Sequence, residues 1–185
     1  MDFDLSEEQR MLQDSVQRLL GGEREGLWPH FAELGLLALP FAESDGGLGG
    51  GPVDTHLVME AIGRELAPVA YLATVVLCGG LLRAAASPAK RAQLVPAIAA
   101  GELTLAFAHS EAQARFELGD VRTTAAKQGE GWVLAGEKRF VIAGDSADQL
   151  IVSARMGEEI ALFLVDAKQP GVSRRGWRTQ DGSRC

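Results

Sequence analysis

Apolar residues over the first hundred positions recur at the three- and four-residue spacing of helices that bury one side. Ser6 followed by Gln9 is a capping-box pattern at the start of the first such segment. Ser87-Pro88 likewise combines a capping side chain with a favourable first helical residue. The pattern and its Gly and Pro breaks predict helical segments over residues 6–20, 29–37, 54–66, 69–86 and 87–100.

Beyond Gly101 the apolar pattern shortens and its period shifts towards two, which is typical of strands. Gly129-Glu130-Gly131 has the composition of a hairpin turn. The expected strands cover residues 103–108, 121–125, 132–134, 138–142, 149–154 and 160–165. Closely spaced strands of this kind predict an antiparallel barrel or sandwich. The fold class is therefore α+β, with an all-α domain at 1–101 and a β domain at 102–185.

Composition and charge exclude several classes of protein. Hydrophobic residues make up 46% of the 185 residues and charged residues 23%, which is typical of a globular chain and argues against disorder. The net charge of -7 argues against a nucleic-acid binder. The acidic start does not resemble a signal peptide, and the longest uncharged run, 66–82, is shorter than the ~20 residues that span a bilayer. We expect a soluble, cytoplasmic protein that binds no membrane.

Residue spacing alone identifies no chemistry. The glycine run 46–51 lacks the Lys-Ser/Thr of a phosphate-binding loop and follows no expected strand, so we interpret it as a structural turn. His30, His56 and His109 have no metal-ligand spacing, and the Gly-x-Ser-x-Gly pattern of many serine hydrolases is absent. The arginine-rich stretch 174–184 is either a solvated loop or an edge that meets an acidic partner or a phosphate.

The order of several short segments adds information that composition cannot. Residues 3–10 (FDLSEEQR), 33–40 (ELGLLALP) and 103–111 (LTLAFAHSE) occur in the order seen in acyl-CoA dehydrogenases, and the whole chain resembles that family. Residues 71–77, 152–155 and 162–166 favour the branch described as the pimeloyl-CoA dehydrogenase small subunit. The resemblance implies an N-terminal helical domain, a middle antiparallel β-barrel and a C-terminal four-helix domain that we expect residues 1–185 to lack.

The family chemistry implied by the resemblance is α,β-dehydrogenation of an acyl-CoA thioester with FAD as cofactor. A glutamate base on the C-terminal domain removes the Cα proton, so no catalytic residue is assigned among residues 1–185. The implied partners are a medium-chain or dicarboxylyl-CoA substrate, electron-transfer flavoprotein or a similar acceptor, and further subunits. A large dehydrogenase subunit or a second copy of the chain would complete a hetero- or homo-oligomer.

Two family patterns carry the expected site residues. Tyr/Phe-x-x-Thr-Glu-Pro-x-x-Gly-Ser-Asp maps without gaps onto 107–117, where Ser110 stands for the Thr and Glu111 is retained. Trp-Ile-Thr maps onto 140–142, where Ile142 has lost the hydroxyl. The resemblance thus implies these cofactor contacts: Phe107, His109, Ser110, Phe140, Val141 and Ile142. Phe116 replaces a family serine that faces substrate, which implies a substrate contact at that position.

Two other functions remain open at this stage. The chain could be a truncated, catalytically inactive dehydrogenase-like protein that acts as a binding or structural partner. It could also be a binding module that uses no flavin. Bound flavin in the visible absorbance spectrum of the purified chain would distinguish an FAD-dependent dehydrogenase from a binding module that uses no flavin.

Overall fold

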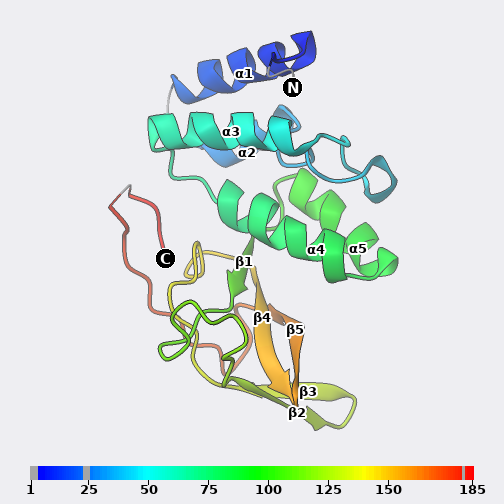
Figure 1. Ribbon diagram of the computed structural model, residues 1–185, viewed down its shortest axis with the longest axis vertical. Coiled ribbons are helices and arrows are strands. Elements are labelled where there is room, and N and C mark those ends of the chain that lie inside the picture. The colour runs from blue at the N-terminus through cyan, green and yellow to red at the C-terminus, as the bar shows by residue number, and fades with distance from the viewer. Residues whose placement is uncertain (1–3, 23–25, 181) are drawn as a thin grey trace. The chain divides into compact units, whose positions relative to one another are not determined.

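The computed structural model describes residues 4–22, 26–180 and 182–185 (Figure 1). Residue 3, the first of the segment 3–10, lies outside these ranges. The chain divides into two compact units, one of residues 1–104 with 179–183 and one of residues 105–178 with 184–185. The helix-then-sheet order of the prediction is confirmed, and the boundary expected after Gly101 stays a prediction.

The first unit is helical. Its helices are α1 (Glu7–Leu20), α2 (Leu27–Glu33), α3 (Pro52–Glu65), α4 (Gly79–Ala85) and α5 (Pro88–Ala99), with a 3₁₀ turn η1 (Glu43–Asp45) and a π-helix η2 (Leu72–Cys78). The predicted capping box is confirmed, because the Ser6 hydroxyl accepts from the Gln9 amide and the Gln9 side chain accepts from the Ser6 amide, both at 3.1 Å. α1 packs against α3, and the fully buried side chains include Phe31, Phe41 and Tyr71.

Three of the helical segments differ from those predicted. α2 begins at Leu27, before Pro29, and residues 34–40 form turns rather than further helix. α3 begins at Pro52 because the Asp54 carboxylate reaches back to accept from the Gly51 amide at 2.6 Å. The apolar run 69–86 forms a π-helix followed by an α-helix instead of one regular helix.

The glycine-rich run is a structural turn, as interpreted from the sequence. The amides of Gly47, Gly49 and Gly50 donate to the carbonyls of Ala42, Phe41 and Leu39. A Cβ at position 47 would collide with the backbone of Phe41, so only glycine permits this close approach.

The second unit is built on a five-stranded sheet of β1 (Leu105–Ala108), β2 (Thr124–Gln128), β3 (Gly131–Ala135), β4 (Gln149–Met156) and β5 (Glu159–Asp166). β4 pairs antiparallel with β5, and β2 forms the predicted hairpin with β3. β1 runs parallel to β4, and β2 makes one parallel pair with it. The sheet is therefore mixed, which corrects the antiparallel prediction. The long connection from β1 to β4 permits the parallel pairing. Closure of these strands into a barrel stays a prediction.

The prediction of a strand over 138–142 is wrong. These residues form an irregular segment that enters a turn at 142–146. Phe140 and Ala143 have φ values of 55° and 59°. These values lie in the left-handed region, whereas residues of a β-strand have negative φ values. The Gly144 amide donates to the Val141 carbonyl, and the Ala143 amide donates to the carbonyl of Arg184.

Alternation along β4 separates the two faces of the sheet. Leu150, Val152 and Ala108 belong to a buried apolar cluster on one face. Ile151 and Ser153 point to the other face, where Ile151 pairs with Phe107 of β1. The end of β1 is thereby held beside Ser153. None of the helices within the described ranges is long and apolar enough to cross a membrane.

Candidate functional site

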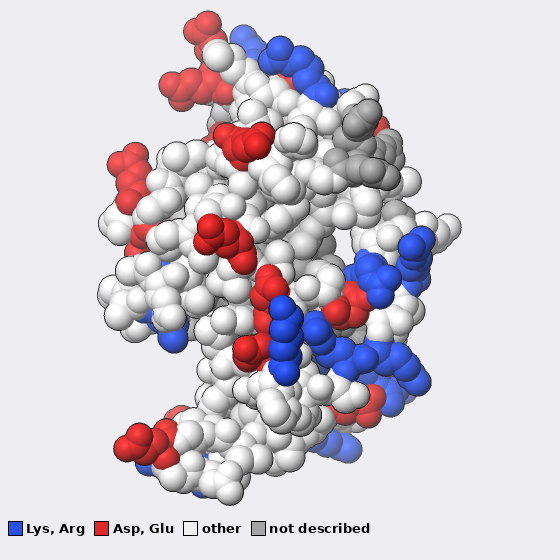
Figure 2. Space-filling model, turned by 180° about the vertical axis from the view of Figure 1, so that it is seen from behind, with Lys and Arg blue, Asp and Glu red and all other residues white. Residues whose placement is uncertain are grey.

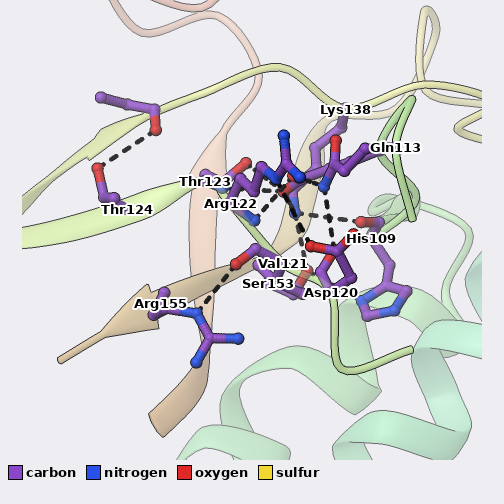
Figure 3. A network of polar contacts seen from close by, with 12 residues as sticks. His109, Gln113, Asp120, Val121, Arg122, Thr123, Thr124, Lys138, Ser153 and Arg155 are labelled. Carbon is purple, nitrogen blue, oxygen red and sulfur yellow. Dashed lines mark hydrogen bonds and ion pairs between the residues drawn. The ribbon is translucent and has the colours of Figure 1, made fainter. Parts of the chain in front are cut away.

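A buried carboxylate organises the loops at the end of β1. The Glu111 side chain is 4% exposed, and its Oε1 accepts from Lys138 Nζ at 2.7 Å, from Thr123 Oγ1 at 2.7 Å and from the Thr123 amide at 3.0 Å. Its Oε2 accepts from the Arg122 amide and from Gln113 Nε2, each at 2.8 Å. Figure 3 shows Lys138, Gln113 and Thr123 gathered in one network of polar contacts. One carboxylate therefore holds three separate segments together.

Lys138 uses every hydrogen of its ammonium group. It donates to Glu111 Oε1 at 2.7 Å, to Ser153 Oγ at 3.0 Å and to the His109 carbonyl at 3.1 Å. The side chain is 8% exposed, so the ion pair with Glu111 is buried. A buried ammonium with three acceptors is fully satisfied and fixes the position of all three groups.

The surroundings of Glu111 keep it ionised. Burial alone would raise the pKa of this carboxyl group, but hydrogen bonds from Lys138, Thr123 and Gln113 together hold the pKa well below its usual range. A carboxylate with a low pKa and five hydrogen-bond donors is a poor acceptor for a carbon-bound proton. Glu111 is therefore a structural anion and not a general base.

His109 is joined to the same network through Ser153. Its Nδ1 lies 2.9 Å from Ser153 Oγ, and Ser153 is completely buried. Burial, followed by the positive charge of Lys138, lowers the pKa of His109 below its ordinary value, although Glu111 acts in the opposite sense. The imidazole stacks on the ring of Phe107, with centroids 5.2 Å apart and an interplanar angle of 20°.

The structure brings the two predicted cofactor segments together. The Arg139 amide donates to the Ser110 carbonyl at 2.8 Å, and Lys138 Nζ donates to the carbonyl of His109. The Phe140 side chain is 71% exposed and makes an edge contact with Trp177, at a centroid distance of 5.9 Å. The end of β1 and the segment beginning at Lys138 thus lie side by side.

Three of the predicted site residues differ from one another in their surroundings. Ile142 is 42% exposed at the start of the turn that follows Phe140. Val141 is partly buried and packs its side chain against the apolar cluster of the sheet. Phe116 is fully exposed in the turn after Glu111, and no described contact joins it to the network.

Sequence reasoning retained Glu111 but missed the residues that surround it. The sequence pattern predicts strands at Lys138, Thr123 and Ser153 and indicates no role for their side chains. One signal was available, because a glutamate that follows an apolar strand and becomes buried needs a cation and several donors. Nothing in the sequence indicates which lysine or hydroxyl supplies them.

The arginine-rich stretch is partly consumed by structural contacts. Arg174 Nη1 donates to the carbonyls of Gly144 and Ala147, at 3.2 and 3.0 Å. Arg184 forms an ion pair with Asp145. On the face drawn in Figure 2, Lys and Arg side chains gather in one area with Asp and Glu side chains among them. These contacts tie Arg174 and Arg184 to the turn at 142–146, and an edge that meets an acidic partner or a phosphate stays a prediction. Within the described ranges no cluster of His, Cys, Asp and Glu could hold a metal ion.

Comparison with known proteins gives matches along nearly the whole chain. The family model "Acyl-CoA dehydrogenase, N-terminal domain" matches residues 6–102, and "Acyl-CoA dehydrogenase, middle domain" matches residues 106–185. Acyl-CoA dehydrogenase FadE27 of Mycobacterium tuberculosis is 35% identical over 90% of this chain and 42% of its own length. The chain spans about half the length of the relatives it matches.

Two solved structures have the same fold. The ChsE4-ChsE5 complex from Mycobacterium tuberculosis has a chain with a TM-score of 0.85 and 29% identity, covering 100% of this chain and 54% of that one. The G363A variant of the Tcur3481-Tcur3483 steroid ACAD has a TM-score of 0.82 and 30% identity, covering 94% and 52%.

Proposed function

Since the chain belongs to the acyl-CoA dehydrogenase family, we propose that residues 1–185 form the helical and β-sheet part of an FAD-dependent acyl-CoA dehydrogenase subunit. The observation that carries the proposal is the joining of the end of β1 to the segment beginning at Lys138 by the Arg139–Ser110 and Lys138–His109 hydrogen bonds. The family resemblance predicts flavin contacts in both segments on independent patterns, and their contact supports the proposal that they share one cofactor.

The residues on this surface fit a flavin ring. The Ser110 amide has no backbone hydrogen-bond partner among the described residues, and its exposed hydroxyl is also available, so it can donate to a polar edge. Phe140 offers an exposed aromatic face, and such contacts add about 0.5–1.5 kcal/mol beyond burial. Ile142 offers only apolar contact, which forfeits a hydrogen bond worth about 0.5–1.5 kcal/mol. FAD held here would accept a hydride from the β-carbon of the acyl group.

The catalytic base is not supplied by this network. Glu111 follows Ser110 directly in the chain, and its five donors keep it from accepting a substrate proton. We therefore assign to these residues the roles of binding and orienting the flavin, and to another part of the enzyme the role of the base. Phe116, which is fully exposed, would provide apolar contact for substrate.

Heteromeric relatives support a multi-subunit enzyme. The two similar structures are the ChsE4-ChsE5 complex and a variant of the Tcur3481-Tcur3483 steroid ACAD. We propose that this chain likewise works with a second dehydrogenase subunit and passes electrons to an electron-transfer flavoprotein or a similar acceptor. We propose an acyl-CoA as the substrate, and more narrowly a medium-chain or dicarboxylyl-CoA such as pimeloyl-CoA.

FAD titration of the 185-residue chain, followed by flavin fluorescence, tests the cofactor proposal. Phe140→Ala should weaken binding, because it removes the exposed ring from the proposed surface. Leu118→Ala is the matched control, since Leu118 is 72% exposed against 71% for Phe140 and lies outside both cofactor segments. Equal losses in the two variants would contradict the proposal, and so would failure of the wild-type chain to bind FAD.

A further inference from the structure

The hydrogen atoms around Ser153 can be counted because the site is buried. Ser153 Oγ accepts one hydrogen from Lys138 Nζ at 3.0 Å, and Ser153 has no exposed surface. Its own hydroxyl hydrogen therefore requires an acceptor within the protein. Among the described residues, the other hydrogen-bond neighbour of Ser153 Oγ is His109 Nδ1 at 2.9 Å, so the Ser153 hydroxyl donates to Nδ1.

The alternative arrangement leaves a group unsatisfied. If His109 carried its proton on Nδ1, that N–H would point at Ser153 Oγ, and the Ser153 hydroxyl hydrogen would have no described acceptor. Lys138 cannot accept it, since an ammonium group has donors only. A buried donor without a partner is destabilising. The arrangement in which the Ser153 hydroxyl donates to an unprotonated His109 Nδ1 is therefore the more stable one.

We propose that Lys138 and Ser153 are positioning residues that fix His109 as a neutral imidazole protonated on Nε2, and that this Nε2–H is a hydrogen-bond donor for the flavin. The flavin part rests on the proposed function, whereas the tautomer follows from the chain alone. The ordered path runs from Glu111 through Lys138 and Ser153 to His109. Stacking on Phe107 holds the ring plane.

Charges on both sides of His109 agree with a neutral ring. Lys138 is a cation that repels a second positive charge, and Glu111 is an anion already paired with that cation. His109 Nε2 has no hydrogen-bond partner within the described part of the chain, so its N–H remains available for a ligand. A neutral donor can polarise a carbonyl or a ring nitrogen without adding net charge.

Long-range ¹H–¹⁵N NMR of the histidine rings tests the tautomer without cofactor or activity. The wild-type chain should show His109 with a protonated Nε2 and an unprotonated Nδ1. Ser153→Ala should shift the His109 Nδ1 resonance and mix in the other tautomer, while Ser153→Thr, which keeps the hydroxyl, should restore the wild-type pattern. His30 and His56 serve as internal controls whose ring signals should not move.

Several results would overturn the inference. A wild-type His109 protonated on Nδ1, or doubly protonated near neutral pH, contradicts the tautomer whether or not the variants fold. Unchanged His109 ring signals in folded Ser153→Ala contradict the positioning role. FAD that binds without moving the Nε2–H resonance contradicts the donor role. If FAD fails to bind, the proposed function of the chain is overturned and with it the flavin part of the inference, and the tautomer result still decides the positioning part.

Discussion

The buried ion pair between Glu111 and Lys138 should couple strongly in a double-mutant cycle. The two side chains are 4% and 8% exposed and their charged atoms lie 2.7 Å apart. Removing one partner of such a pair costs about 3–5 kcal/mol, because the other charge stays buried without compensation. Lys138→Met keeps the apolar stem, and Glu111 retains its four other donors, so we expect a loss of about 3 kcal/mol.

The double variant Lys138→Met/Glu111→Gln should lose less than the sum of the two single changes. Neither charge is then left buried alone, and contacting pairs couple by up to about 3 kcal/mol. We expect a coupling free energy of about 2–3 kcal/mol, measured by urea unfolding at constant pH and salt. Far-UV circular dichroism and tryptophan fluorescence should both follow the transition.

An exposed pair on the same segment provides the matched control. Arg139 and Glu137 form an ion pair at 3.0 Å with side chains 51% and 73% exposed. Pairs of this kind contribute about 0.2–1 kcal/mol. A cycle with Arg139→Met and Glu137→Gln should therefore give the smaller coupling. Equal coupling in the two cycles would refute the view that Glu111 and Lys138 act as a buried clamp.

Three further outcomes are expected. Because the pKa of Glu111 is lowered on folding, the unfolded chain binds more protons below about pH 4.3, so stability should fall from pH 5 to pH 3 with a shallower slope in Glu111→Gln, as measured by urea unfolding. Gly47→Ala should lower the melting temperature, because its Cβ has no space, whereas Gly63→Ala in open space within α3 should raise stability by about 0.5–1 kcal/mol. Burial raises the pKa of Cys78 to about 12, so a thiol reagent at pH 8 should label partly exposed Cys185 and reach Cys78 only after unfolding.

Local signals made the helical half of the fold predictable. The Ser6 and Ser87 caps act within one turn of chain, and both are present, with Ser87 Oγ accepting from the Lys90 amide at 3.3 Å. The start of α3 was missed because the Asp54 side chain caps Gly51 from inside the helix rather than from its own cap position. The apolar run 69–86 contains helix as predicted, but periodicity does not distinguish a π-helix from an α-helix.

The site depends on contacts that no local pattern encodes. Family resemblance predicts cofactor contacts in both segments, which stays a prediction. The strand predicted over 138–142 is wrong, although Phe140, Val141 and Ile142 have strand-forming side chains. Tertiary bonds override that preference, notably the Lys138 bond to the His109 carbonyl, which joins residues far apart in sequence. The parallel pairing of β1 with β4 is equally non-local, and it is what places Ser153 beside His109.

The central claim is that the segments 107–111 and 138–142 together hold the flavin. The most direct measurement is an amide ¹H–¹⁵N NMR map of the 185-residue chain during titration with FAD. The account predicts that amides of His109, Ser110, Phe140 and Ile142 shift together with a common midpoint, while amides of α1 do not move. FAD that shifts only amides elsewhere, or shifts one segment without the other, would contradict the claim.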